Sequence, residues 1–197
     1  MNLGMLSGSY WKWEMYMNWI SRTSLLLLLS LNLAFSFSVS AGKLETPLPA
    51  PEFSQTDADS WLNSAPLSLR ELRGKVIMLD FWTFDCWNCY RSFPWMRQLE
   101  QALADEAFTV IGIHTPEFAH ERVRANVEAK IDEFELHHPV MMDNQFIYWQ
   151  MMGNKYWPAF YLIDKQGKVR SIYIGETHVG SAQARAIEGD IRELLRE

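Results

Sequence analysis

The chain has 197 residues, a length that suits one ordinary domain with an appendage, and its 48% hydrophobic and 21% charged content excludes global disorder. Its 18 basic and 24 acidic residues give a net charge of −6 at pH 7. Because no basic run of five or more residues occurs, nucleic acid is not expected as a partner.

The N-terminal 41 residues have the pattern of a targeting segment. No charged residue occurs from Thr23 to Gly42, the basic residues Lys12 and Arg22 precede this run, and small residues close it. This order is typical of a secretory signal peptide over residues 1–41. An uncleaved membrane anchor through residues 20–41 is the main alternative, and a buried core helix is a third. With either a signal or an anchor, the folded part is exported to the periplasm or another extracytoplasmic compartment.

Residues 42–59 are expected to form an extended lead-in, because they hold three closely spaced prolines and show little periodicity. The folded domain is placed at residues 60–197. Trp61–Leu62 is expected to start a short strand, with Pro66–Leu69 as its partner. Lys75–Trp82 is an almost continuous apolar run bounded by turn signals, which indicates a strand buried on both faces of a sheet.

A helix is predicted next, because apolar side chains recur at spacings of three and four. They are Cys89, Phe93, Met96, Leu99 and Leu103. A second buried strand is predicted at Phe108–Ile113, followed by a helical segment at Glu117–Phe134. Pro139–Met142 reads as a short strand and Phe146–Met152 as a short helix.

The C-terminal part is predicted to form a hairpin and a helix. Ala159–Ile163 and Val169–Ile174 are the hairpin strands, joined through a polar turn that contains Gly167. Ala182–Leu195 has the periodicity of an amphipathic helix. This order of elements predicts the α/β class, with a mixed central sheet of four or five strands and helices on both faces.

The chain has only two cysteines, Cys86 and Cys89, where the buried strand gives way to the helix. A disulfide that closes so short a loop adds little stability, so the pair points to chemistry. A thiolate at a helix N-terminus is stabilised by the helix dipole, which makes Cys86 the attacking thiol and Cys89 the resolving one. A zinc site that recruits His137 or His138, and a purely structural disulfide, remain as alternatives.

Five further side chains are candidates for the site. Asp80 lies in an apolar strand, where an unpaired carboxylate is costly, so it is paired, protonated or functional. Glu117 follows a strand end and is a possible second acid. Trp82, Trp87 and Trp157 could form an apolar surface that docks an extended substrate, although Trp82 could equally belong to the core.

Several unlinked motifs resemble one family over about residues 60–180. Asp80-Phe81-Trp82, three residues, Cys-x-x-Cys and a proline five residues later resemble the active-site segment of thioredoxin. The exported, longer form resembles the TlpA-like thioredoxins. Within those, the chain is most similar to the thioredoxin domain of DipZ-type proteins, in the segments Phe81–Thr83, Val110–Phe118, Asp143–Asn144, Tyr156–Ala159 and Tyr161–Asp164.

The resemblance implies a thioredoxin fold with a TlpA-like helix-strand insertion at about residues 117–142. It also implies that Pro158 is the cis-proline facing the disulfide and that Asp80 is the buried acid that moves a proton for Cys89. Asp85 departs from the pattern, because a carboxylate next to Cys86 opposes thiolate formation. The membrane-spanning electron-transfer domain of DipZ-type proteins is missing, so a separate redox partner protein, either free or membrane-embedded, is expected.

The expected function is thiol–disulfide exchange with the thiols and disulfides of extracytoplasmic proteins, as a reductase and without a bound cofactor or metal. Three alternatives stay open. The chain could work in the opposite direction as a disulfide oxidase. It could be a metal-binding or metallochaperone module that uses Cys86, Cys89 and one histidine, or a substrate-binding module without turnover.

Overall fold

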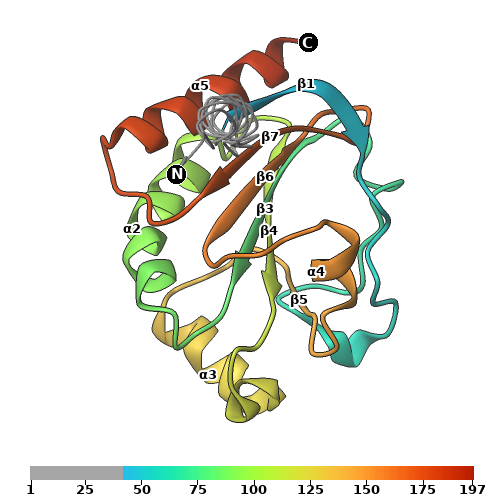
Figure 1. Ribbon diagram of the computed structural model, residues 1–197, viewed down its shortest axis with the longest axis vertical. Coiled ribbons are helices and arrows are strands. Elements are labelled where there is room, and N and C mark those ends of the chain that lie inside the picture. The colour runs from blue at the N-terminus through green and yellow to red at the C-terminus, as the bar shows by residue number, and fades with distance from the viewer. Residues whose placement is uncertain (1–41) are drawn as a thin grey trace, which may run out of the picture. The chain divides into compact units, whose positions relative to one another are not determined.

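A seven-stranded mixed sheet organises the computed structural model, which describes residues 42–197 (Figure 1). The predicted signal or anchor over residues 1–41 lies outside the described residues. The strand order is β1-β7-β6-β3-β4-β5-β2. In chain order the strands are β1 (Gly42–Pro49), β2 (Trp61–Leu62), β3 (Val76–Trp82), β4 (Phe108–His114), β5 (Val140–Met142), β6 (Ala159–Ile163) and β7 (Lys168–Ile174).

Helices cover both faces of this sheet, as predicted. They are α2 (Trp87–Ala102), α3 (Arg124–Glu133), α4 (Ile147–Met151) and α5 (Ala182–Arg196), with short 3₁₀ helices η1 (Ala58–Ser60) and η2 (Ala119–Arg122). Buried side chains of α2, α3 and α5 share one core cluster with alternate residues of β3, and α4 packs on the opposite face (Figure 1). This α/β arrangement is the thioredoxin fold that the resemblance implied.

The sheet has more strands than the predicted four or five, because both edges are extended. In the lead-in, β1 pairs antiparallel with β7. Its side chains are mainly exposed, so its sequence has no apolar pattern that would predict a strand. At the other edge, β2 pairs antiparallel with β5. The prediction that Pro66–Leu69 pairs with Trp61–Leu62 is wrong, since residues 66–69 form no strand.

The helix-strand insertion is confirmed at residues 117–142, which contain η2, α3 and β5. The predicted continuous helix is divided at Val123, whose φ of −82° and ψ of 114° are extended rather than helical. Since β5 pairs in parallel with β4, the insertion adds a strand to the sheet and returns beside the cysteine-bearing end of β3.

β3 is the centre of the sheet, because β4 pairs with it in parallel on one side and β6 pairs antiparallel on the other. All seven of its residues are buried. Side chains alternate between the faces of a strand. Met78 and Trp82 belong to the cluster under α2, and Asp80, between them in the alternation, therefore faces α2 and Cys89 as well.

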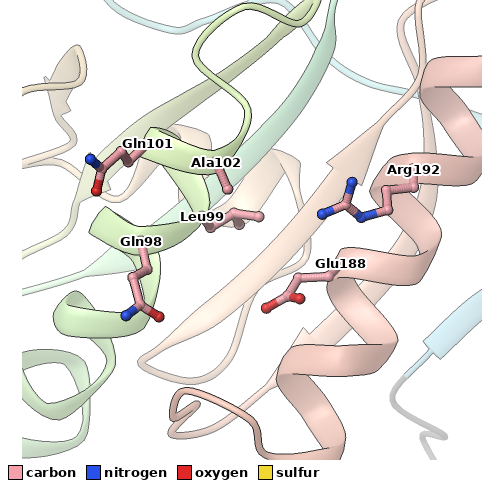
Figure 2. Close-up of a pocket in the computed structure, with 6 residues that line it drawn as sticks. All are labelled: Gln98, Leu99, Gln101, Ala102, Glu188 and Arg192. Atoms are coloured by element: carbon pink, nitrogen blue, oxygen red, sulfur yellow. The ribbon is translucent and has the colours of Figure 1, made fainter.

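A pocket of about 350 Å³ lies between the C-terminal half of α2 and α5 (Figure 2). It is lined by Gln98, Leu99, Gln101, Ala102, Glu188 and Arg192. A helix rises about 1.5 Å per residue, so these α2 residues lie roughly 18 Å or more along the helix from Cys86. This pocket is therefore separate from the cysteine pair.

No helix among residues 42–197 is both long and apolar enough to cross a membrane.

The Gly112→Ala variant is expected to be less stable by about 1–3 kcal/mol, because a Cβ on Gly112 of β4 would lie 2.9 Å from the indole nitrogen of Trp82 and 3.1 Å from Val140. Denaturant unfolding measures the change. Gly189→Ala is the matched control, because no atom lies within 4 Å of its added Cβ on α5. That variant should gain about 0.5–1 kcal/mol. Equal stabilities for the two variants would contradict close packing over Gly112.

Candidate functional site

Cys86 and Cys89 form a disulfide at the N-terminus of α2, with their Cα atoms 5.3 Å apart. Cys86 is the N-cap residue, and the backbone N–H of Cys89 donates a hydrogen bond to its Sγ at 3.2 Å. Cys86 is half-buried, whereas Cys89 is 1% exposed. The sulfur that a protein substrate can reach is therefore the one that receives the helix N–H group.

Cys86 borders a pocket of about 270 Å³ between the start of α2 and the end of α3. Its lining consists of Phe84, Asp85, Cys86, Trp87, Tyr90, Glu133 and Phe134. The Trp87 side chain is 65% exposed and stacks on Tyr90 with the ring centroids 5.4 Å apart. An accessible aromatic surface thus adjoins the reactive sulfur.

The other two predicted tryptophans lie in different environments. Of the two alternatives for Trp82, docking surface is wrong and core packing is confirmed, because Trp82 is fully buried and packs edge-on against Phe93. Its position in the alternation of β3 turns it toward the core. Trp157 is half-buried against Trp149, with ring centroids 4.4 Å apart. The Trp157–Pro158 peptide bond is cis, as predicted, and Trp157 packs against the core cluster that contains Cys89.

Asp80 is buried at 1% exposure, and neither carboxyl oxygen has a hydrogen-bond partner within the described part of the chain. Its cross-strand neighbours are Gly112 on β4 and Phe160 on β6. Burial, with a smaller contribution from the negative charge of Glu100, raises the pKa of Asp80 to about 8. An acid with this pKa can both accept and release a proton near neutral pH.

Glu121, which sequence reasoning missed, joins the insertion to the loop before Cys86. Its side chain is fully buried and accepts hydrogen bonds from the Thr83 hydroxyl and from the backbone N–H of Asp85 at 3.1 Å. Its other oxygen accepts from the N–H groups of Glu117 and Phe118, both at 2.6 Å. Because a buried carboxylate needs this many donors, Glu121 fixes the two segments against each other.

Two charged side chains near the site are exposed. Asp85, which was expected to oppose thiolate formation, lies 2.6 Å from His120 Nε2. The ion pair offsets its negative charge when the histidine is protonated. The Glu117 side chain is exposed and contributes to the site through its backbone N–H, so its role as a second acid stays a prediction.

His114 and His138 are the two buried histidines of the described residues. Burial lowers the pKa of His114 to about 4, against the attraction of the Glu121 carboxylate. Among residues 42–197 there is no group of three or more histidine, cysteine, aspartate or glutamate side chains placed to hold one metal ion.

The chain is similar in sequence to bacterial proteins over most of its length. DipZ of Mycobacterium tuberculosis is 41% identical over 160 residues, which cover 80% of this chain but 22% of DipZ. The chain thus spans about a fifth of the length of that relative. Thiol-disulfide oxidoreductase ResA of Geobacillus thermodenitrificans is 30% identical over 126 residues, covering 64% of this chain and 67% of ResA.

Solved structures support the same relationship. A Chlorobium tepidum protein provisionally assigned as thiol:disulfide interchange protein DsbE superposes with a TM-score of 0.65 at 25% identity, covering 77% of this chain and 99% of that one. The model of the AhpC/TSA family matches residues 48–172, which include both cysteines and the insertion. The predicted resemblance to thioredoxin-like proteins of the DipZ type is confirmed, and the chain belongs to the AhpC/TSA family.

Proposed function

We propose that this chain is a thiol–disulfide oxidoreductase that exchanges electrons between the Cys86–Cys89 pair and protein substrates. One observation carries the proposal: an accessible Cys86 sulfur at the N-cap of α2 receives the N–H of a buried Cys89. The first thiol is thus placed to react with a substrate and the second to resolve the product.

In the reducing direction, the Cys86 thiolate attacks a substrate disulfide, and one substrate sulfur leaves as a thiolate. Cys86 and the other substrate sulfur then share a mixed disulfide. Cys89 transfers its proton to Asp80, and the resulting thiolate attacks Cys86 Sγ. The second substrate sulfur leaves as a thiolate and takes a proton from water. The substrate is reduced by two electrons, and Cys86–Cys89 becomes the disulfide.

The substrate segment is proposed to lie over Trp87 and Tyr90, beside the pocket at Cys86. Trp157 packs against the core cluster of the cysteines, and Pro158 follows it directly before β6. Both residues are assigned to shape the substrate edge. No bound cofactor enters any step, because both electrons come from the two sulfur atoms.

The reducing direction is proposed from the limited stabilisation of the thiolate. A strongly oxidising pair has a reduced form that its surroundings stabilise. Here one N–H group reaches Cys86 Sγ, and the Asp85 carboxyl borders the same pocket. The N–H group favours the thiolate, whereas the Asp85 carboxylate opposes it when His120 is neutral, so the reduced form gains little stabilisation from its surroundings and the pair tends to give up electrons.

The place of action and the electron donor are part of the same proposal. The targeting pattern of residues 1–41 supports export, to the periplasm or a comparable compartment, as a free or anchored protein. A separate redox partner protein, either free or embedded in the membrane, is proposed to re-reduce Cys86–Cys89.

The Cys89→Ser variant is expected to accumulate mixed disulfides with substrate proteins, because Cys86 can still attack and resolution is lost. Non-reducing electrophoresis after alkylation measures the trapped species. Cys86→Ser is the matched control and should trap none. Trapping by Cys86→Ser alone would reverse the two roles, and trapping by neither would remove the proposed activity.

The reduction potential of Cys86–Cys89, measured against glutathione, is expected at about −200 mV or lower, in the range of reducing thiol proteins. Weak stabilisation of the Cys86 thiolate is the physical reason. A potential near −120 mV, typical of a strong oxidant, would instead assign the chain as a disulfide oxidase.

The Asp80→Asn variant is expected to resolve mixed disulfides roughly ten- to a hundredfold more slowly, with the first attack by Cys86 almost unchanged. Asparagine keeps the shape of Asp80 but cannot accept the Cys89 proton. Stopped-flow tryptophan fluorescence separates the two steps. Equal resolution rates in the two proteins between pH 6 and 9 would reduce Asp80 to a structural residue.

Stability gives a second measurement for Asp80→Asn. The pKa of Asp80 is about 8 in the folded chain against a usual value of 3.8, so only the folded state holds this proton between those values. The stability that Asp80 contributes is therefore complete below pH 4 and is lost as the pH rises toward 8. Relative to wild type, the variant should gain up to about 1.4 kcal/mol per pH unit across that window.

A further inference from the structure

The proposed role of Asp80 requires a proton path, because Asp80 is fully enclosed. Its carboxyl is 1% exposed and has no hydrogen-bond partner among the described residues. With a pKa of about 8, Asp80 is mostly protonated at pH 7, so it must release a proton to solvent before it can accept one from Cys89, and a proton must return when the disulfide is reduced again. The path between Asp80 and solvent therefore has to pass through other side chains on the α2 face of the sheet.

His138, in the segment before β5, approaches the cross-strand neighbour of Asp80. Gly112 pairs with Asp80 in the β3–β4 register. Because Gly112 has no side chain, the Nε2 atom of His138 comes within 3.3 Å of the place where its Cβ would lie. The indole nitrogen of Trp82 comes within 2.9 Å of the same place. Both nitrogens are buried and unpartnered within the described part of the chain, as is the Asp80 carboxyl.

The other ring nitrogen of His138 lies beside a carboxyl group that is partly exposed to solvent. Nδ1 lies 3.2 Å from both carboxyl oxygens of Glu100, on α2. The His138 side chain is 1% exposed, whereas that of Glu100 is 27% exposed. The negative charge of Glu100 also contributes to the raised pKa of Asp80, which places the two carboxyl groups in electrostatic range. Glu100 thus connects the buried imidazole with solvent.

We propose that His138 and Glu100 form the proton path between Asp80 and solvent, an inference that rests on the proposed function. When Cys89 is oxidised, Asp80 passes its proton to Nε2 of His138 across Gly112, through a bridging water molecule, since the two groups are not hydrogen-bonded to each other directly. Nδ1 passes its own proton to Glu100, and Glu100 passes a proton to water. When the disulfide is reduced again, each proton moves inward by the reverse steps, which restores the original tautomer of His138. Protons balance over the cycle.

The surrounding ionisable groups do not offer another path of this kind. On the same face of the sheet, α2 presents Cys89 and Glu100, and β4 presents His114. The Nε2 atom of His114 lies 3.4 Å from the Thr83 hydroxyl, which donates to the fully buried Glu121, so that route ends at a buried carboxylate and does not reach solvent. The acids of α5 are engaged elsewhere. Glu188 accepts from the Trp95 indole, and Asp190 accepts from the hydroxyls of β7.

The test is the His138→Asn variant, whose amide replaces Nδ1–H as a donor to Glu100 but cannot relay a proton. Stopped-flow single-turnover resolution should show one phase in wild type. In the variant, molecules with ionised Asp80 should resolve at the wild-type rate, and the rest should wait for a proton to leave, roughly tenfold more slowly. The amplitude of the slow phase should fall as the pH rises through about 8, the pKa of Asp80.

His137→Asn is the matched control, because His137 is adjacent in sequence but exposed. It should behave as wild type. Glu100→Gln changes a partly exposed side chain and gives a second test that does not depend on folding around His138. It should also produce the slow phase. A single phase in both His138→Asn and Glu100→Gln would overturn the path, whether or not the rate changes, because a purely structural effect shifts a rate without creating a pH-dependent amplitude.

Carboxyl NMR of Asp80 in each variant supplies the pKa against which the amplitudes are compared. Amplitudes that do not follow that pKa would also overturn the path. Failure of the proposed function would look different, since wild type would then form no mixed disulfide at all.

Discussion

The site depends on the enclosure of β3. This strand is hydrogen-bonded along both edges, to β4 and β6, and all its residues are buried. A strand held on four sides cannot shift its register without moving polar groups to apolar surroundings. The position of its last residue, Trp82, is therefore fixed, and so is the start of the loop that ends at Cys86. The same enclosure deprives Asp80 of water and sets its proton affinity.

The position of Asp80 on β3 thus determines both its burial and its proposed reaction with Cys89. Alternation along β3 sends Asp80 toward α2, where the buried Cys89 also lies. A carboxyl group here destabilises the fold when ionised, which is tolerable only because the surrounding apolar packing is extensive. Stability given up at a working site is common in enzymes. Because Gly112 has no side chain, the imidazole of His138 also reaches this face of the sheet.

The central strands could be predicted because buried strands consist of continuous runs of apolar residues. The apolar runs of β3, β4 and β6 need only local pattern. In contrast, the side chains of β1 are mainly exposed. Its pairing with β7 depends on backbone hydrogen bonds, which the order of apolar and polar residues does not predict. β2 was predicted but assigned the wrong partner, since pairing with β5 is a long-range choice.

Among the site residues, too, those marked by a local motif could be predicted, and those defined by long-range contacts could not. Cys86, Cys89 and Pro158 were recognised from spacing and family resemblance. Glu121 lies among polar residues of an insertion. Two of its four hydrogen bonds, from Glu117 and Phe118, are local, whereas those from Thr83 and Asp85 come from a segment that only the fold brings close. A glutamate three residues after a helix start was the one local signal, and it indicates a cap rather than a tertiary contact.

The Glu121 contacts also determine how this region can fluctuate. Local opening in proteins occurs in cooperative units rather than residue by residue. Since one carboxylate holds both the Thr83–Asp85 loop and the start of η2, neither can open without leaving a buried charge unsatisfied. The loop and the insertion therefore behave as a single cooperative unit. A protein that binds the exposed side of the insertion would order the cysteine loop as well, without touching either sulfur.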